Sequence, residues 1–430
     1  MPSGPPSQDA VRAQVAAVWR IEAARVIAGL ARMVRDVALA EDLAQDALVA
    51  ALEQWPESGV PDNPGAWLTA VARHRYVDTV RREVTYERKL EEVGRGTSPV
   101  QEDPMADIEI GPTVSDDVLR LMLTACHPVL APEARVALTL RMIGGLTTEE
   151  IASAYLVPTS TMAARITRAK KTLGAANVPF EAPTGNELAV RLSSVLEVVY
   201  LVFNEGYAAS SGSSWTRPVL CQEAMRLGRM LAGLASDEPE AHGLVALMEI
   251  QASRLRSRVG ADGSSVQLLD QDRSRWDRLL ITHALGALAR AEALGGSGPY
   301  VLQAAIAACH ARAGVAADTD WARIAELYAD LVELTRSPIV ELNRAVAVSM
   351  ATGPLEALQI VDDLIADDVP SMRSYHLVPA VRGDLLSRLG RSVEARGEFE
   401  RAAELCSNEA ERAILLERAA SLQGPCSDYS

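Results

Sequence analysis

A chain of 430 residues with 48% apolar and 23% charged residues is too long for one typical hydrophobic core, so we expect two or three domains. Aromatic residues make up only 4% of the chain, and this composition excludes collagen-like and low-complexity chains and favours helices over sheets. The net charge of −15, taken as an average, argues against nucleic-acid binding, because affinity for phosphate comes largely from Lys and Arg. Most of the acidic excess lies after residue 186, so the charge has to be considered segment by segment.

The cysteines and the N-terminal segment indicate the compartment. The five cysteines form no CxxC pair, which predicts reduced thiols, several of them in the core: Cys126, Cys221, Cys309, Cys406 and Cys426. The segment MPSGPPSQDA lacks the basic-then-apolar order of a signal peptide, and no apolar run reaches the roughly 18 residues of a membrane span. We expect a cytoplasmic protein with no membrane partner.

Helical spacing of apolar residues begins near the N-terminus. Residues 11–55 predict two helices that turn near Asp36, and the second helix is expected to end at Pro56. Asn63 is a good N-cap and Pro64 suits the first helical position, so a third helix is predicted to begin there. These helices predict a first small bundle.

An acidic linker and a second bundle follow. Residues 91–114 lose the helical pattern and are rich in Gly, Pro, Ser, Thr and acidic residues, which is typical of an extended linker. In the second bundle, over 115–176, one helix is expected to end near Pro128 and the next to begin at Pro132 and stop at Gly144.

The second bundle carries a helix-turn-helix signal. Thr147 and Glu150 form a capping box for a short helix, and after Pro158 either Thr159 or Ser160 is expected to cap a longer one. Four apolar residues of the longer helix would face the bundle: Met162, Ile166, Ala169 and Leu173. The opposite face is polar and basic: Ser160, Thr161, Ala164, Arg165, Arg168 and Lys171. A helix inserted into the major groove needs such groups, although a hairpin with a solvated basic end would show the same pattern.

The helix beginning at Asn63 carries a second basic surface. Two rows of basic residues have a seven-residue spacing: His74, Arg81 and Arg88, and Arg75, Arg82 and Lys89. Trp67 lies nearby, and cations interleaved with aromatic rings suit a single nucleic-acid strand. Trp67 could equally be a core residue and the rows a solvated face, so the pattern alone leaves both interpretations open.

The preceding helix carries an acidic face. Asp42, Gln45 and Asp46 share one side of it, beside Glu41. Such a face could dock a basic partner helix or could simply be exposed to solvent, and the spacing does not choose between them.

Residues 187–425 predict consecutive amphipathic helices. Five residues match the pattern of small and large residues in a tetratricopeptide unit: Gly383, Leu386, Ala395, Phe399 and Ala402. Two looser helix pairs precede it: 300–314 with 320–335, and 338–351 with 354–365. A non-repeating helical domain is the alternative.

Two segments of this third region could suggest catalysis. Residues 270–277 alternate in charge, which more simply predicts local ion pairs and caps around a buried Trp276, and residues 203–207 predict a helix end with Gly206 beyond it. His127 and His310 are isolated, and we find no phosphate loop and no metal-ligand cluster. We therefore expect no enzymatic activity, no cofactor and no metal.

The order of these parts resembles a known family. The motifs are AEDLAQDA at 40–47, NPGAWLTAVAR at 63–73, LTTEEIA at 146–152 and TMAARITRAK at 161–170. Over about residues 10–176 the chain resembles the extracytoplasmic-function (ECF) sigma factors, which are sigma-70-type factors of bacterial RNA polymerase. The remainder is similar to the subgroup with a C-terminal tetratricopeptide-like (TPR-like) extension.

The resemblance implies an all-α fold and a domain order. Sigma region 2 would span 10–90, the acidic linker 91–114, helix-turn-helix sigma region 4 115–176, and the TPR-like regulatory extension 187–425. The implied partners are core RNA polymerase, through its β′ clamp and β flap, and promoter DNA, with an unknown protein or peptide possible for the extension. The extension would regulate initiation in cis, and the linker would lie in a polymerase channel otherwise used by RNA.

The resemblance also implies roles for individual residues. The residues implied to bind core polymerase are Glu41, Asp42, Gln45 and Asp46. Those implied to capture the melted minus-ten element, with a base flipped into a loop pocket, are Asn63, Trp67, His74, Arg75, Arg81 and Arg82. Those implied to bind the minus-thirty-five duplex are Thr159, Ser160, Thr161, Arg165, Arg168, Lys170 and Lys171.

Two other classes of protein fit parts of the sequence. A helix-turn-helix regulator with a TPR sensor domain would bind duplex DNA without polymerase and would not need the acidic face around Asp42. A TPR scaffold would bind a protein or peptide, and its basic rows would be incidental. Co-purification with core RNA polymerase distinguishes the three classes.

Overall fold

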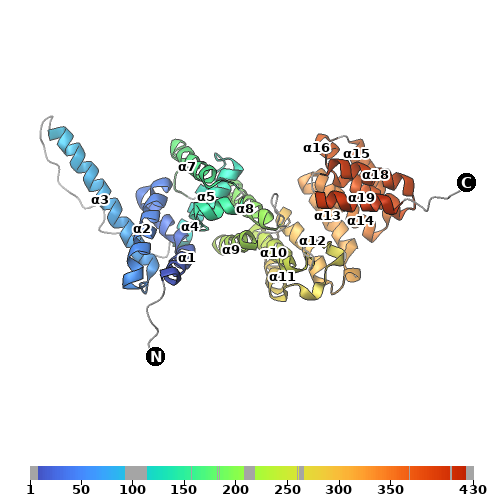
Figure 1. Cartoon of the computed structure of the whole chain (residues 1–430), viewed down its shortest axis with the longest axis horizontal. Coiled ribbons are helices and arrows are strands. Elements are labelled where there is room, and N and C mark those ends of the chain that lie inside the picture. Colours follow the sequence, from blue (N-terminus) through green and yellow to red (C-terminus); the bar gives the residue numbers. More distant parts are fainter. Residues whose placement is uncertain are drawn as a thin grey trace, which may run out of the picture. The chain divides into compact units, whose positions relative to one another are not determined.

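The structure is a computed structural model, and among the residues it describes it contains helices and no strands, which confirms the all-α prediction (Figure 1). The described residues are 8–92, 114–155, 157–181, 183, 185–207, 218–258, 260, 266–367, 369–406 and 409–422. The chain divides into two compact units, residues 1–235 and 236–430. The division falls inside the predicted extension.

Three helices form the first bundle of unit 1: α1 (Gln8–Val34), α2 (Val37–Ser58) and α3 (Pro64–Glu92). The Asp36 carboxylate caps α2 by accepting hydrogen bonds from the backbone N–H groups of Ala38 and Leu39. The predicted end at Pro56 was wrong, because Pro56 lies inside α2 and the helix runs to Ser58. The neighbouring Trp55 is buried and anchors the last turn, and Gly59 closes it with a φ of 78°.

Four helices form the second bundle: α4 (Val114–Ala125), α5 (Pro132–Met142), α6 (Thr148–Ala154) and α7 (Thr159–Ala175). The capping box of α6 is confirmed, since the Glu150 N–H donates to Thr147 Oγ1 at 3.1 Å and the Thr147 N–H to Glu150 Oε2 at 2.8 Å. The predicted cap of α7 was wrong, because Pro158 occupies the N-cap position and Thr159 already belongs to the helix. The predicted linker lies almost entirely outside the described residues.

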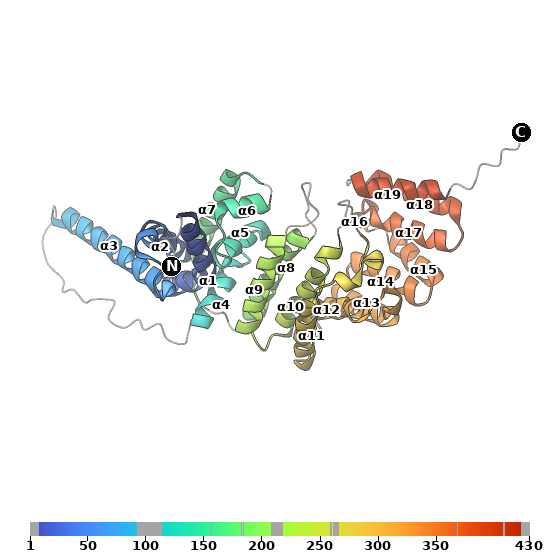
Figure 2. The same ribbon diagram turned by 60° about the horizontal axis from the view of Figure 1, so that its bottom comes forward.

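The next two helices, α8 (Asn186–Tyr207) and α9 (Pro218–Leu234), form a hairpin that also belongs to unit 1. Gly206 lies within α8 rather than beyond its end, which corrects the prediction. A Cβ at this position would lie 2.6 Å from the backbone nitrogen of Cys221, so the glycine permits the close approach of the two helices. The hairpin packs on α4 and α5 (Figure 2).

Polar contacts fasten the hairpin to the second bundle. The Arg135 guanidinium of α5 donates to Ser194 Oγ at 2.9 Å and forms an ion pair with Glu197 at 3.3 Å. Arg226 of α9 donates to the carbonyl oxygen of Ile143 at 2.9 Å. The beginning of the predicted extension is therefore continuous with the helix-turn-helix bundle.

Unit 2 contains ten α-helices among its described residues: α10 (Pro239–Ser253), α11 (Arg278–Ala293), α12 (Pro299–Arg312), α13 (Trp321–Thr335), α14 (Pro338–Ala351), α15 (Pro354–Ala366), α16 (Pro370–Arg373), α17 (Leu377–Arg388), α18 (Ser392–Leu405) and α19 (Glu409–Ser421). Four 3-10 segments join them: η1 (Leu255–Ser257), η2 (Leu268–Asp270), η3 (Arg273–Arg275) and η4 (Ala316–Asp318). The predicted helix pairs correspond to α12 with α13 and to α14 with α15.

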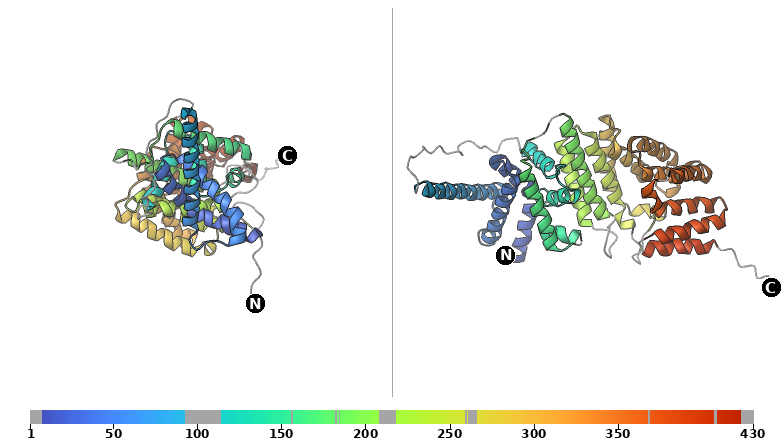
Figure 3. Two further views of the ribbon diagram at one scale, coloured as in Figure 1. Left: turned by 90° about the vertical axis from the view of Figure 1, so that its left-hand side faces the viewer. Right: turned by 90° about the horizontal axis from the view of Figure 1, so that it is seen from above.

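The predicted repeat unit is a helix pair, α17 with α18, and α19 packs beside α18 (Figure 3). Ala395, Phe399 and Ala402 are buried. A Cβ on Gly383 would lie 3.1 Å from the ring of Phe399, so the small residue lets the ring fill the space between the helices. The spacing of small and large residues predicted this packing correctly.

The 270–277 segment is structural, as its capping pattern predicted. Trp276 is buried, and Asp277 caps α11 through the backbone N–H groups of Leu279 and Leu280. Arg273 differs from the prediction, since it is buried rather than ion-paired at the surface. Its guanidinium donates hydrogen bonds to three oxygens: the carbonyl oxygens of His310 and Ala313, and Oγ1 of Thr319.

Among the described residues, no helix combines the length and the apolar character that crossing a membrane requires.

Candidate nucleic-acid interface

The acidic face of α2 contains the four residues predicted to bind polymerase. Asp42 and Asp46 are exposed, Gln45 is half-buried, and Glu41 is only 2% exposed. The buried Nε2 of Gln45 has no hydrogen-bond partner. The sequence pattern had not indicated that Glu41 would be buried, because nothing near it along the chain covers it.

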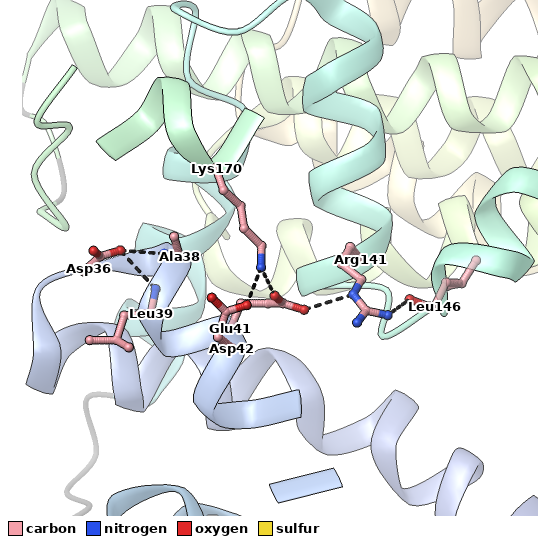
Figure 4. Close-up of polar contacts among 8 residues, drawn as sticks. All are labelled: Asp36, Ala38, Leu39, Glu41, Asp42, Arg141, Leu146 and Lys170. Atoms are coloured by element: carbon pink, nitrogen blue, oxygen red, sulfur yellow. Dashed lines mark hydrogen bonds and ion pairs between the residues drawn. The ribbon is translucent and has the colours of Figure 1, made fainter. Parts of the chain in front are cut away.

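Two cations from the second bundle cover Glu41 (Figure 4). Arg141 of α5 donates from Nε to Glu41 Oε1 at 2.9 Å and from Nη1 to the carbonyl oxygen of Leu146 at 3.2 Å. Lys170 of α7 forms an ion pair with Glu41 Oε2 and donates to Asp42 Oδ1 at 2.7 Å. We call these four side chains, Glu41, Asp42, Arg141 and Lys170, the α2–α7 bridge.

Electrostatics keep Lys170 of the α2–α7 bridge charged. Burial alone would lower the pKa of Lys170, but the charges and hydrogen bonds of Glu41 and Asp42 outweigh it and raise the pKa above its ordinary value. Lys170 therefore remains protonated at neutral pH. A carboxylate as buried as that of Glu41 needs such partners, because an unpaired buried charge is costly.

The start of α3 carries the residues predicted to bind the minus-ten element. The Asn63 side chain caps the helix by accepting a hydrogen bond from the Ala66 N–H at 3.1 Å. Trp67 is half-buried and packs edge-on against Trp55, with ring centroids 5.3 Å apart. Trp67 therefore contributes to the core and is also partly exposed, which is compatible with both sequence interpretations.

One residue of the basic rows of α3 contacts the acidic face of α2. His74 and Arg81 are exposed, and Arg75 forms an ion pair with Asp46 at 3.5 Å. The side chain of Arg82 lies outside what the structure describes, as do those of Arg88 and Lys89. Within the described part of α3, the ion pair joins the predicted promoter-binding row to the predicted polymerase-binding face.

The recognition face of α7 is turned outward, because its apolar stripe is buried as predicted: Met162, Ile166, Ala169 and Leu173. Five predicted contact residues are exposed: Thr159, Ser160, Thr161, Arg168 and Lys171. Arg165 is half-buried. Lys170 differs from these residues, because its side chain points to α2 and is engaged in the α2–α7 bridge.

Sequence reasoning missed Arg141 and a second contact between the two bundles. Arg20 of α1 donates to Glu150 of α6 at 2.5 Å. The Arg141–Glu41 and Arg20–Glu150 pairs join residues 100 and 130 positions apart, so no local spacing could have indicated them.

Family models match three parts of the chain. The Sigma-70 region 2 model matches residues 20–85 and the Sigma-70, region 4 model matches residues 120–173. A family of unknown function, DUF6596, matches residues 191–292. The first two matches, with the helix-turn-helix geometry of α6 and α7, define a sigma-70-type factor that continues into a DUF6596 domain.

A relative covers nearly the whole chain. The chain belongs to the family of the uncharacterized protein R00370 of Rhizobium meliloti (strain 1021), with which it shares 43% identity over 391 residues, 91% of this chain and 92% of that protein. Among solved structures, the yeast Tom70 crystal structure matches with a TM-score of 0.30 and 12% identity, over 90% of this chain and 80% of that one.

Proposed function

We propose that this protein is an ECF-type initiation factor that binds core RNA polymerase and directs it to specific promoters in the cytoplasm. The observation that carries the proposal is the ordered pair of sigma-70 regions on one chain, with the outward face of α7 free to enter a major groove. The α2 face would dock on the β′ clamp, and the region 4 bundle would contact the β flap.

Promoter opening would need no bond-making chemistry by this chain. Binding to polymerase and the capture of unstacked bases on Trp67 and the basic rows of α3 would offset the cost of separating the strands. The α7 face would hold the minus-thirty-five duplex, with Arg165 and Arg168 at the base edges and Lys171 nearer phosphate. The polymerase itself would join the nucleotides.

The α2–α7 bridge supports a closed state of the free protein. While Lys170 binds Glu41 and Asp42, it cannot contact DNA, and Glu41 is not accessible to polymerase. Both predicted partners would therefore favour an arrangement in which α7 has moved away from α2. The apparent affinity for polymerase would be reduced by the fraction of protein that is closed.

The TPR-like extension would control this closed state in cis. Its first hairpin, α8 and α9, is fastened to α4 and α5, so forces on the hairpin act on region 4 directly. Helix α9 and region 2 also line one cavity of about 680 Å³. Arg226 and Met230 of α9 line it together with Asn63 and Arg73. A protein or peptide bound to the remainder of the extension would then shift the balance between closed and open chains.

In vitro transcription tests the proposal. Purified full-length protein, core polymerase and promoter templates with intact or scrambled minus-thirty-five elements are combined, and transcript is measured. Dependence of the transcript on both the protein and the intact element supports a sigma factor, and no transcript above core polymerase alone contradicts it. Repeating the assay with residues 1–235, whose folding is checked by thermal melting, tests cis regulation, because unchanged promoter opening would rule out a role for unit 2.

The second candidate is a polymerase-independent helix-turn-helix regulator. The burial of Glu41 favours it, because the α7 face is open while the predicted polymerase-binding face is partly covered. Co-purification with core polymerase distinguishes the two, since the regulator would bind promoter duplex with the same affinity whether or not polymerase is present.

A further inference from the structure

Three metal-ligating side chains meet where α17, α18 and α19 come together. His376 is the N-cap residue of α17, Cys406 is the C-cap residue of α18, and Glu411 lies in the first turn of α19. His376 Nε2 lies 3.2 Å from Glu411 Oε1, and Cys406 Sγ lies 3.8 Å from Glu411 Oε2. One donor atom from each residue lies within 4.8 Å of the other two, the one such group of three in the described part of the chain.

We propose that His376, Cys406 and Glu411 bind a zinc ion, with water as the fourth ligand. Tetrahedral zinc, with bonds of about 2.0–2.3 Å to nitrogen, oxygen and sulfur, places neighbouring ligand atoms about 3.4–3.6 Å apart. The separations of 3.2 and 3.8 Å involve the two different oxygens of Glu411, and one donor atom from each residue lies within 4.8 Å of the other two. Rotation of the Glu411 carboxylate and small side-chain movements would bring the three donor atoms to that spacing. A thiolate, an imidazole and a carboxylate are all ligands that zinc accepts.

The imidazole of His376 supports this assignment. Its Nε2 is buried and forms no hydrogen bond, although a carboxylate oxygen of Glu411 lies 3.2 Å away. A buried polar atom that forms no hydrogen bond is uncommon in folded proteins and calls for an explanation. Coordination of the Nε2 lone pair to an ion between the two side chains supplies one.

Burial and charge also suit a cation at this place. Cys406 is 2% exposed, whereas the Glu411 side chain is 42% exposed and leaves a side on which the ion and its water can enter. Binding would release one proton from the Cys406 thiol, so that a thiolate and a carboxylate balance the two charges of the ion. The nearby Arg412 guanidinium donates to the carbonyl oxygen of Cys406.

The proposed site would tie the beginnings of α17 and α19 to the end of α18. None of the three helices supplies more than one ligand, so the bound ion would cross-link the last helices of unit 2. Zinc would therefore raise the melting temperature of this unit, because it binds the folded chain and not the separated ligands. This inference does not depend on the function proposed for the sigma-70 regions.

Cobalt titration of the full-length protein tests the site. After treatment with a chelator, the reduced protein is titrated with Co²⁺ and then with Zn²⁺ while the near-ultraviolet absorption is recorded. We expect a thiolate-to-cobalt charge-transfer band that saturates at one equivalent and disappears when Zn²⁺ displaces the cobalt. Cys406→Ser should abolish the band, and His376→Gln and Glu411→Gln should weaken zinc binding by about 100-fold or more, beyond the loss typical of an outer-shell change.

Two variants serve as controls for other thiols. Cys309→Ser removes another buried thiol, Cys426→Ser removes the thiol nearest the C-terminus, and both should keep the band and the affinity. The helical circular dichroism of every variant shows whether it has folded. His376 and Glu411 are partly exposed, so their variants keep the test decisive if Cys406→Ser fails to fold. Absence of a thiolate band, or a band and affinity unchanged in the His376 and Glu411 variants, would overturn the proposal.

Discussion

The predicted polymerase-binding face of α2 and the predicted DNA-binding face of α7 differ in their exposure to solvent. The α7 face is mostly open to solvent, with Arg168 and Lys171 unobstructed on its outer side. The α2 face is partly covered, because Glu41 lies beneath Arg141 and Lys170. Basic residues of the same chain can therefore cover an acidic surface that was predicted to bind a partner. The exposure of a residue cannot be inferred from the sequence pattern of its own helix.

The same comparison explains why the acidic net charge of the chain is a poor guide to DNA binding. The net charge of −15 argued against DNA binding, yet α3 and α7 are rich in basic residues, and Arg168 and Lys171 lie on the exposed face of α7. Another basic residue of α7, Lys170, is neutralised by the acidic face of α2. We expect the free protein to bind stray DNA weakly for both reasons, since long-range repulsion and internal pairing act in the same direction.

The largest expected effect is a loss of stability when the covered face of α2 is changed. Glu41→Ala leaves Arg141 and Lys170, whose side chains are 17% and 16% exposed, without their shared carboxylate. Removing one partner from a buried ion pair typically costs about 3–5 kcal/mol, so unit 1 should lose about 3 kcal/mol of unfolding free energy. Denaturant unfolding measures the loss. The exposed Glu53 of the same helix supplies the control, and an equal effect of Glu53→Ala would show that the bridge is not responsible.

A smaller effect, on promoter discrimination, is expected at the exposed face of α7. Arg165→Ala should reduce discrimination between intact and scrambled minus-thirty-five elements by roughly 10- to 100-fold, corresponding to the loss of about 1–3 kcal/mol from a base contact. Core polymerase binding should persist, because Arg165 lies outside the α2–α7 bridge. Fluorescence anisotropy with holoenzyme measures the discrimination, with Arg312→Ala in unit 2 as a matched control. Undiminished discrimination would mean that α7 does not read this element through Arg165.

The smallest effect on stability is expected where α2 meets α3. The Asp46–Arg75 pair is 3.5 Å apart with side chains 59% and 39% exposed, and such a pair contributes about 0–1 kcal/mol. Asp46→Asn should therefore leave thermal unfolding almost unchanged while weakening binding to core polymerase. Asp62→Asn, an exposed change outside α2, should affect neither measurement. If Asp46→Asn binds polymerase as well as the unchanged protein does, Asp46 is not part of the docking face.

Local chemistry explains which elements could be predicted from the sequence. The caps predicted at Asn63 and Thr147 were correct, because a cap depends on residues two or three positions away. The ends at Pro56 and Gly206 were wrong, because tertiary packing of Trp55 and the close approach of Cys221 decided them. Propensity is a weak guide where packing acts on the same residue.

Contacts between distant segments explain what the sequence could not predict. The α2–α7 bridge joins Glu41 to Lys170 across two bundles, and the cluster of His376, Cys406 and Glu411 draws one ligand from each of three helix ends. The expectation of no metal site rested on the absence of closely spaced ligands, a pattern that this cluster does not need. In both cases the residue types are ordinary along the chain, and only the fold brings them together.

The most direct test of the central claim is the affinity of the full-length protein for core RNA polymerase, measured without DNA. Lys170→Ala should bind about 5- to 30-fold more tightly than the unchanged protein, because losing roughly 1–2 kcal/mol from the closed state exposes the α2 face. Lys171→Ala, which removes the neighbouring exposed lysine, should bind as the unchanged protein does. Equal affinity of all three proteins would contradict the closed state, and no binding by any of them would contradict the sigma-factor function itself.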